Sequence, residues 1–575
     1  MALLFVGGTE TIKKTLNPSG AFGDGDQLFV ASSGNLVVDG SLAVEIAANN
    51  AEAVVRGAIF STGTAIATPD ASHLWQYGWA PEFNGFRLQV DSGGLVAGDY
   101  MGVEVIGDGT AITNAGMITG HYSISLHGDG TSVVNTGWIV GGGSAISISG
   151  DNTLVRNHGI IETTGSDEFW SDGIYLSGIN ATLENTGSIA SSGVAALLGG
   201  DGRLLNSGAI IGGGSTYQAV QVNGNALVNN SGTITNLEGE ALVASNFWGS
   251  EVATFQLLNT GTISGETNAI RTVSGASGHV LTAEIVNQGT IQGNIEFGAG
   301  NDSYDGRLGQ LHGYLIAGDG NDTFRGGEGD EIVSGGAGVD LILAGAGDDA
   351  VHGGAGADSM DGGAGSDLLM YAQSAAGVTV NLVTGKGWGG DAQGDRFGGF
   401  ERLWGSNHAD LLIGSAGDND LSGLDGHDAI NGGAGNDIIN GGAGDDTLRG
   451  GDGDDILEGG LGRDILFGEA GFDTFVFRDL LDSPPSAPSR DQIRDFVQGE
   501  DLIDLALIDA NANLAGEQAF SFRGSLGFTG AGGELRYVQS GGNTLVYADA
   551  NGDKAVDFAV VLNGLHTLTA DDFIL

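Results

Sequence analysis

The chain has 575 residues, of which 108 are glycine, 6 are proline and none is cysteine. Its 72 acidic residues outnumber the 20 basic ones and give a formal net charge of −52 at pH 7. This composition excludes collagen, a disulfide framework and a thiolate metal site. Phosphate backbones and anionic lipids repel so acidic a chain, so nucleic acid is excluded as a partner and cations become the expected one.

The N-terminal region, residues 1–100, is expected to form a cap. Its apolar run Leu3–Val6 has no positive charge before it, so it is not a secretory signal peptide. No run of 18 or more apolar residues occurs, so no transmembrane segment is expected. The aromatic cluster between Trp75 and Phe86 either closes the open end of the repeat array that follows or offers a platform for a sugar chain.

Residues 101–296 contain an internal repeat in which Asn-x-Gly-x-Ile recurs eight times, at intervals of 21 to 29 residues. Strands of period two, punctuated by Gly and Asn at this coil length, predict a parallel β-solenoid, or β-helix. The Ile is expected to stack in the core, and the Asn to turn a corner and form an amide ladder. The eight asparagines are Asn114, Asn135, Asn157, Asn185, Asn206, Asn230, Asn259 and Asn287.

Two of the longer coils carry insertions with acidic and aromatic side chains, at residues 167–172 and 247–251. Insertions in a solenoid often form its binding face. These segments either present aromatic platforms and carboxylates to a sugar chain or are ordinary solvated loops, and the sequence leaves both interpretations open.

A sharper repeat follows, with the nine-residue pattern Gly-Gly-x-Gly-x-Asp-x-U-x, in which U is apolar. Six contiguous units begin at residue 317, a partial unit precedes them at 297–305, and eight more occupy 405–476. Position six is acidic in every unit except one, where it is Asn419. The candidate metal ligands at this position are Asp302, Asp322, Glu331, Asp340, Asp349, Asp358, Asp367, Asp410, Asp428, Asp437, Asp446, Asp455, Asp464 and Asp473.

This spacing points to calcium. Each unit predicts a glycine-rich turn followed by a very short strand, so two units make one coil of 18 residues and carboxylates two units apart are stacked. Calcium takes six to eight oxygens, which turn carbonyls and the Asp residues of adjacent coils can supply. Without the ion the stacked carboxylates repel one another, and burying one apolar side chain per unit contributes only about 1.5–3 kcal/mol. Calcium binding is therefore expected to be coupled to folding.

These units resemble the calcium-binding nonapeptide repeats of RTX (repeats-in-toxin) proteins, which form a parallel β-roll. The resemblance implies one calcium ion between each unit and the next but one, which gives roughly ten ions across residues 297–476. Glu331 and Asn419 depart from the pattern, which implies weaker or altered coordination at these two positions.

The interruption at 371–404 and residues 490–575 resemble the insert and the C-terminal domain of serralysins (peptidase M10 type). The resemblance rests on the motifs Phe400–Ser406, Asp501–Leu505 and Asp571–Leu575. In that family the C-terminal region carries an uncleaved type I secretion signal. This implies export by the type I secretion machinery to the extracellular space or the cell surface.

The fold is thus expected to be all-β, with four regions: the cap region 1–100, the β-solenoid 101–296, a calcium-bound parallel β-roll at 297–476 with an insert at 371–404, and a β-rich C-terminal cap and secretion domain at 477–575. The loop Asp549–Asp553 alternates oxygen ligands as calcium loops do, but it lacks the Glu at the twelfth position of an EF-hand. It is either a further ion site or a hairpin turn.

No catalytic residue is assigned, because neither a His-Glu-x-x-His nor a Gly-x-Ser-x-Gly motif occurs. A polysaccharide lyase or epimerase would need a base and a cation for the uronate carboxylate. The solenoid offers only scattered candidates, and no spacing brings them together. These candidates are Arg156, Arg203, Arg271, Tyr175 and His158.

Regular coils without catalytic signatures favour a secreted structural, surface or adhesive element. The alternative is a calcium-dependent, polysaccharide-active β-helix enzyme, and a toxin-like activity also remains open. Beyond calcium and the secretion machinery, the expected partners are a cell-surface or matrix polysaccharide and further copies of the chain.

Overall fold

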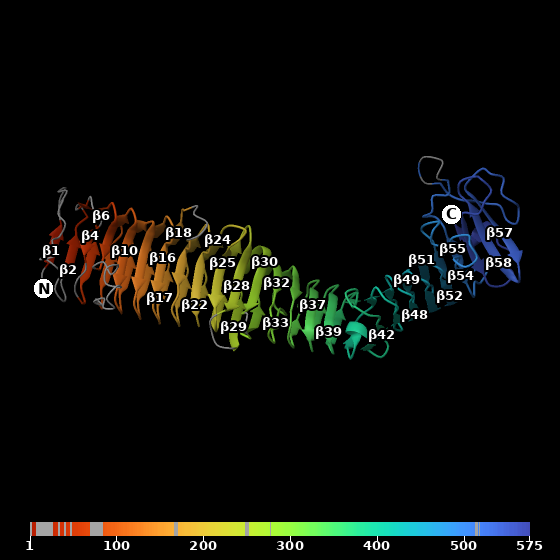
Figure 1. The fold of residues 1–575 in the computed structure, drawn as a ribbon, viewed down its shortest axis with the longest axis horizontal. Coiled ribbons are helices and arrows are strands. Elements are labelled where there is room, and N and C mark those ends of the chain that lie inside the picture. Colours follow the sequence, from red (N-terminus) through yellow and green to blue (C-terminus); the bar gives the residue numbers. More distant parts are fainter. Residues whose placement is uncertain are drawn as a thin grey trace. The chain divides into compact units, whose positions relative to one another are not determined.

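The computed structural model describes residues 3–6, 27–32, 35–38, 42–45, 49–68, 84–165, 171–247, 252–275, 278–511, 516 and 518–575. The chain divides into two compact units, Met1–Asp319 and Gly320–Leu575 (Figure 1). The described residues form strands and two single-turn 3-10 helices, η3 (Gly390–Ala392) and η4 (Ala570–Asp572), which confirms the all-β prediction. No helix in these ranges is long and apolar enough to cross a membrane.

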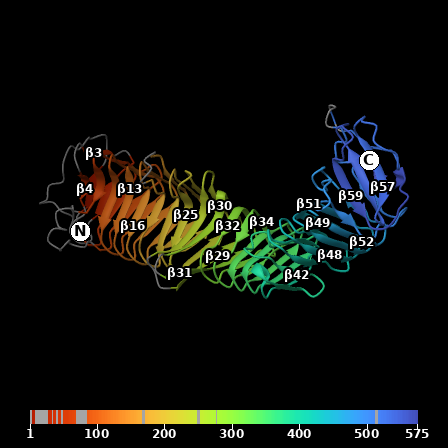
Figure 2. The same cartoon turned by 45° about the vertical axis from the view of Figure 1, so that its right-hand side comes forward.

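The first unit is a β-solenoid with three stacks of parallel strands, and Figure 2 shows strands β13, β16, β25 and β30 of one stack in this order along it. The first stack consists of β1 (Leu3–Val6), β2 (Gln27–Val30), β5 (Glu52–Val55), β8 (Arg87–Val90), β11 (Ala111–Asn114), β14 (Ser132–Asn135), β17 (Leu154–Asn157), β20 (Thr182–Asn185), β23 (Arg203–Asn206), β26 (Ala226–Asn230), β29 (Val252–Asn259), β31 (Val280–Asn287) and β33 (Ser303–Asp305).

The other two stacks join in β30 (Thr262–Ser274), which is long enough to pair in both. The second stack consists of β3 (Asn35–Val38), β6 (Ala58–Ser61), β9 (Leu95–Gly98), β12 (Met117–Gly120), β15 (Trp138–Gly141), β18 (Ile160–Thr163), β21 (Ser188–Ala190), β24 (Ala209–Gly212), β27 (Thr233–Asn236), β30, β32 (Thr290–Glu296) and β34 (Gln310–His312). The third consists of β4 (Leu42–Glu45), β7 (Thr64–Ala67), β10 (Met101–Ile106), β13 (Tyr122–His127), β16 (Ile146–Ser149), β19 (Ile174–Leu176), β22 (Ala196–Gly200), β25 (Gln218–Asn223), β28 (Glu240–Asn246), β30, β32 and β35 (Tyr314–Ile316).

The Asn-x-Gly-x-Ile motif explains this register. The Ile of all eight motifs is fully buried in the solenoid core, as in Ile118 and Ile291. The eight Asn side chains form one continuous buried ladder, in which each Nδ2 donates to Oδ1 of the next Asn at 2.8–2.9 Å. The predicted core position and the predicted amide ladder are both confirmed.

The second unit contains the β-roll, which has two stacks of parallel strands. One runs through β36 (Thr323–Arg325), β38 (Leu341–Ala346), β40 (Ser359–Ala364) and β44 (Arg396–Gly398), and resumes with β42 (Thr379–Asn381), β46 (Leu411–Ile413), β48 (Ala429–Ala434), β50 (Thr447–Asp452), β52 (Ile465–Ala470), β54 (Gln492–Ile493) and β59 (Phe558–Leu562). The other consists of β37 (Ile332–Gly338), β39 (Ala350–Gly356), β41 (Leu368–Met370), β45 (Arg402–Trp404), β47 (Asp420–Ser422), β49 (Ile438–Ala443), β51 (Ile456–Leu461), β53 (Thr474–Val476), β55 (Leu502–Asp504) and β60 (Phe573–Ile574).

Partner residues within either block of the roll are 18 apart, as in Ile430 and Leu448, so two units do make one coil. The apolar residue at position eight is buried in each coil of the roll. In the insert, β43 (Lys386–Trp388) pairs antiparallel with β42 and β44. The C-terminal cap adds β56 (Ser521–Phe522), β57 (Glu534–Ser540) and β58 (Asn543–Asp549), and β58 pairs antiparallel with β57 and β59.

Several residues singled out in the sequence lie outside the described ranges. They are the aromatic residues from Trp75 to Phe83, residues 167–170 of one insertion, and Trp248 and Glu251 of the other.

Candidate functional site

The acidic residues at position six of the nonapeptide units are the candidate metal ligands. All fourteen are buried, as is Asn419, although they lie in turns of a very acidic chain. Each one directly precedes the short strand of its unit, as Asp446 precedes β50. The glycine-rich turn therefore holds each carboxylate at the start of a strand, one per unit.

In the second block these carboxylates form two ladders. From Asp428 onward, Oδ1 of each Asp in the block accepts the backbone N–H of the position-six residue one coil earlier, as Asp446 does from Asp428 at 2.8 Å. Donor–acceptor distances along the two ladders are 2.8–3.1 Å. The stacking of carboxylates two units apart is therefore present in the structure.

The first block has the same arrangement, and its two ladders continue into the insert. Asp358 donates its N–H to Oδ1 of Asp395 at 2.9 Å, and Asp367 donates to Oε2 of Glu401 at 3.1 Å. In the partial repeat at 297–305, which belongs to the first compact unit, Oδ1 of Asp302 accepts the N–H of Ala283 at 2.5 Å.

The ladders of the second block extend beyond the repeats into the cap. Asp464 donates its N–H to Oδ1 of Asp491, and Asp473 donates to Oδ1 of Asp501. Two residues of the insert and two of the cap thus extend the ladders. The sequence analysis did not select these four residues as ligands, because none follows a Gly-Gly-x-Gly turn. A local signal was present, since each is an acid followed two residues later by a buried apolar residue. The extra residues are Asp395, Glu401, Asp491 and Asp501.

The second carboxylate oxygen of most ladder residues is buried without a hydrogen-bond partner. A buried polar oxygen normally has a hydrogen-bond partner, so a row of buried carboxylate oxygens without one fits the coordination of cations. These atoms are Oε2 of Glu331 and Oδ2 of Asp340, Asp349, Asp358, Asp367, Asp428, Asp437, Asp446, Asp455, Asp464 and Asp491.

Most of these oxygens face the first glycine of their own nonapeptide repeat. A Cβ added to Gly432 would lie 2.2 Å from Oδ2 of Asp437 and 2.7 Å from the carbonyl oxygen of Gly450 in the next coil. The same pair of contacts occurs at Gly423, at 2.3 and 2.6 Å. A carboxylate oxygen and a backbone carbonyl oxygen thus approach the same small space, which only glycine leaves open.

Oxygens of these two kinds fit calcium. Calcium accepts carboxylate and backbone carbonyl oxygens in flexible geometry. Among the described residues, no three His, Asp or Glu side chains converge on one point. The carboxylates come one per turn, so the rest of a ligand set has to come from the backbone.

Burial also changes the acidity of the ladder. It raises the pKa of Asp428 and Asp437 to about 7 and that of Asp446 to about 6, in each case because removing the carboxylate from water penalises its charged form. Neighbouring carboxylates raise the pKa of Asp428 further. Without a cation the folded ladder therefore retains protons near neutral pH.

The two departures from the repeat pattern behave differently. Asn419 satisfies both amide atoms within the chain, since Nδ2 donates to the carbonyl oxygen of Glu401 at 3.0 Å and Oδ1 accepts the N–H of Ser415 at 2.6 Å. Glu331 keeps an unpartnered buried Oε2, like the aspartates, and burial raises the pKa of this carboxyl group. Glu331 therefore still offers a buried carboxylate oxygen to a cation, which Asn419 does not.

The loop Asp549–Asp553 is closed by its own backbone. Asp549 accepts the N–H groups of Gly552 and Lys554, and Asp557 accepts those of Ala550 and Asn551. The carboxylates of Asp549 and Asp557 thus bind backbone N–H groups of the turn between β58 and β59.

The scattered solenoid residues considered for polysaccharide chemistry do not form a cluster. Arg156 pairs with Glu184 at 2.7 Å, and Arg271 pairs with Glu240 at 2.5 Å. His158 contacts the hydroxyl of Thr186. The cations that a uronate carboxylate would need are therefore already paired with glutamates at two of three positions.

Comparison with known proteins identifies the second half of the chain. Residues 313–342 and 334–369 match the RTX calcium-binding nonapeptide repeat, and residues 414–575 match the peptidase M10 serralysin C-terminal region. No curated protein matches the chain.

Among solved structures, two subunits of a mannuronan C5-epimerase from Azotobacter vinelandii are similar. The R3 subunit is 26% identical over 29% of this chain and 79% of its own, with a TM-score of 0.19. The R2 subunit is 29% identical over 29% of this chain and 91% of its own, with a TM-score of 0.17. The extracellular lipase LipA from Serratia marcescens is 18% identical over 44% of this chain and 40% of its own, with a TM-score of 0.14.

Calcium-binding repeats, buried carboxylate ladders and the C-terminal match agree with one another, and the family comparison gives no match to a protease domain. The chain carries RTX calcium-binding nonapeptide repeats and a serralysin-type C-terminal domain, a combination typical of extracellular proteins that leave the cell by type I secretion.

Proposed function

We propose that calcium folds the β-roll outside the cell, and that the folded chain serves as a structural, surface or adhesive element. The observation that carries the proposal is the row of buried carboxylate oxygens without partners beside glycine-lined carbonyls. Such a row is unfavourable without cations, so the roll and the bound ions stabilise each other.

The proposed ligand set contains the fourteen acidic residues of the repeats, with roughly ten calcium ions in all. Asp395 and Glu401 of the insert and Asp491 and Asp501 of the cap are added to it, because they continue the same ladders. Bound calcium would neutralise the stacked charges. The carboxylates and turn carbonyls of this chain would hold it in place.

The same property supports a switch linked to export. Where calcium is scarce, charge repulsion keeps residues 297–476 open, which suits passage through a secretion channel. Outside, calcium folds the roll, and the region 477–575 closes its last coil. The first compact unit, Met1–Asp319, then forms the presented part of the chain.

The test is far-UV circular dichroism of the purified chain during a calcium titration. Strand signal should appear as calcium is added and vanish with a chelator. The proposal would be contradicted if the circular dichroism spectrum of the 300–476 segment changed neither with calcium nor with chelator.

A matched pair of variants locates the effect. Asp446→Ala removes a buried ladder carboxylate, and we expect the calcium concentration at the folding midpoint to rise roughly threefold to tenfold. Asp452→Ala removes an exposed carboxylate six residues away, at a variable position of the repeat, and should leave the midpoint unchanged. Equal calcium midpoints for the two variants would show that the ladder carboxylate does not contribute to calcium binding.

The adhesive or structural role has its own test. Light scattering during the same titration should show large regular particles if folded chains assemble into a matrix. A calcium-folded monomer would instead restrict the role to adhesion by single chains.

A further inference from the structure

The solenoid carries a groove that the calcium ladders do not explain. It has a volume of about 530 Å³ and is lined by residues from five successive coils, between Val37 on β3 and Val140 on β15, and by Thr164 beyond β18. Because these strands pair in register, the groove crosses them and runs along the stack.

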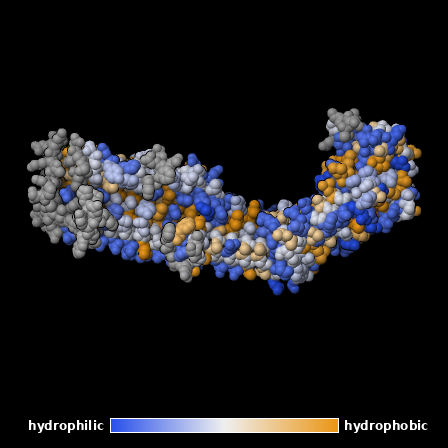
Figure 3. Space-filling model, in the orientation of Figure 1, coloured by the Kyte–Doolittle hydropathy of each residue, from blue (hydrophilic) through white to orange (hydrophobic). Residues whose placement is uncertain are grey.

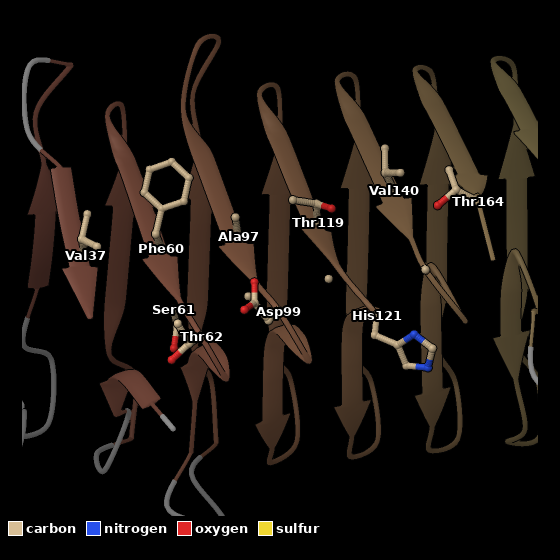
Figure 4. Close-up of a pocket in the computed structure, with 13 residues that line it drawn as sticks. Val37, Phe60, Ser61, Thr62, Ala97, Asp99, Thr119, His121, Val140 and Thr164 are labelled. Carbon is tan, nitrogen blue, oxygen red and sulfur yellow. The ribbon is translucent and has the colours of Figure 1, made fainter. Parts of the chain in front are cut away.

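The two sides of the groove differ in chemistry. Figure 4 shows Val37, Phe60, Ala97, Thr119 and Val140 in one row across the strands. Four of these five side chains are apolar, and Phe60 is 38% exposed.

A polar row lies beside the apolar one. It contains Thr62, Asp99 and His121, and Gly98 and Gly120 lie between the two rows in sequence and also line the groove (Figure 4). Neither position has room for a side chain, because a Cβ at Gly98 would lie 1.9 Å from the carbonyl oxygen of Met101 and one at Gly120 would lie 2.7 Å from the backbone nitrogen of Gly102. The groove therefore presents an apolar surface and a line of hydrogen-bonding groups in parallel.

A sugar chain has matching features, since each pyranose ring has an apolar C–H face and a rim of hydroxyl groups. Parallel strands lie ~4.8 Å apart, which is close to the length that one sugar ring adds to an extended polysaccharide. We propose that this groove binds a neutral, linear polysaccharide lying along the solenoid, with one sugar ring per coil. This inference rests on the proposed adhesive role and gives it a ligand.

Charge determines which polysaccharides fit. The segment 84–165, which contributes much of the groove, contains seven acidic residues against two arginines. Arg156 is paired with Glu184, which leaves Arg87 as the remaining arginine of the segment. An acidic polysaccharide would be repelled, whereas Asp99 can accept hydrogen bonds from neutral hydroxyl groups.

An aromatic group borders the polar row. The Tyr100 ring is 54% exposed and stacks on His121, with ring centroids 6.3 Å apart and an 18° angle between the planes. The Tyr122 ring meets both of them edge-on. Exposed rings held by their neighbours provide a surface on which a C–H face can pack with little loss of side-chain entropy. Figure 3 shows hydrophobic patches next to hydrophilic ones on the face of this unit that it draws.

The test is calorimetric titration of the full chain in calcium with neutral β-1,4-linked oligosaccharides, namely cellohexaose, mannohexaose and N-acetyl-chitohexaose. A hexamer of galacturonate serves as the acidic counterpart. At least one neutral hexamer should bind, its affinity should rise with chain length from two to about six rings, and the acidic hexamer should not bind.

Variants tie binding to the groove. Phe60→Ala and His121→Ala should each weaken binding about threefold to tenfold. Tyr314→Ala, which removes a ring with 44% exposure elsewhere on the same unit, should leave it unchanged. Far-UV circular dichroism confirms that each variant retains its fold.

Binding should persist in chelator, because no ladder carboxylate lines the groove, so failure of the calcium switch and failure of this site are distinguishable. The inference is overturned if no neutral hexamer binds, if only the acidic one does, or if Phe60→Ala has no effect. Self-association that Phe60→Ala abolishes would assign the groove to contacts between copies of the chain and overturn it as well.

Discussion

At most turns of the roll, one glycine and one carboxylate share a small space. The glycine leaves room that a Cβ would fill, and the carboxylate directs an oxygen into that room. Buried polar atoms without a partner cost free energy, so the arrangement is stable only when a cation, or a proton, is present. The recurring pattern of residue types in the repeats thus reflects one local requirement: a glycine without Cβ beside a carboxylate oxygen that can bind a cation.

Gly432→Ala tests this requirement. The added Cβ would lie 2.2 Å from Oδ2 of Asp437, so the carboxylate has to move away from its position. We expect the calcium midpoint to rise roughly tenfold in a circular dichroism titration. Gly398→Ala is the control, because nothing lies within 4 Å of a Cβ there, and an equal shift in this variant would contradict the prediction.

At the scale of elements, two kinds of ladder hold the strands in register. The solenoid ladder is made of neutral amides that satisfy one another, so it needs no ion. The roll ladder is made of carboxylates, each with one satisfied and one unsatisfied oxygen at most positions. We therefore expect the first to be stable without an ion and the second to depend on calcium.

Asn185→Ala tests the amide ladder. It removes the acceptor of Asn157 and the donor to Asn206 in a fully buried row, and we expect the free energy of unfolding of the solenoid to fall by about 1–3 kcal/mol. Denaturant unfolding in chelator measures this. Asn180→Gly keeps the left-handed turn at φ 58° and removes only an exposed amide. It should therefore change the free energy of unfolding by no more than a few tenths of a kcal/mol.

At the scale of the whole molecule, we expect the two units to depend on calcium to different degrees. The amide ladder occupies the first unit, and all but one of the fourteen candidate ligands lie in the second. Limited proteolysis should show the difference. In chelator, cleavage should concentrate within residues 320–575 and spare 84–165. Equal resistance of both regions in chelator would show that the roll does not need calcium.

Calcium-dependent folding should also depend on pH. The pKa of Asp358, Asp428 and Asp473 is raised by burial to about 7, from an ordinary value of 3.8. The folded, calcium-free roll therefore holds more protons than the unfolded chain between about pH 4 and pH 7, and its stability falls as pH rises through that window.

In chelator, we therefore expect more strand signal at pH 5 than at pH 8. With calcium the trend reverses, because the ion has to displace the protons, so the calcium midpoint should fall as pH rises. Circular dichroism titrations at four pH values would measure both trends. A midpoint independent of pH would indicate that the ladder is already ionised.

Much of this fold could be predicted from the sequence because its repeats are strict. The Asn-x-Gly-x-Ile period fixed the buried Ile and the amide ladder, since each Asn side chain donates to the equivalent Asn of the next coil. The nonapeptide period fixed the 18-residue coil and the burial of residues such as Asp446. Asp395 and Asp491 could not be selected with the same rule, because they lack the glycine turn and join the ladders only after intervening segments fold back.

Sequence alone thus determined what repeats from coil to coil: the solenoid, the roll, the position of each repeated carboxylate and the identity of the cation. Only the tertiary structure showed the features that require contacts between segments of different sequence. It continued the ladders through the insert and the cap, and it placed Phe60 and His121, which belong to no repeat motif, along one groove. The physical reason is that a repeat specifies contacts between equivalent positions, whereas contacts between non-equivalent positions follow from the stacking register.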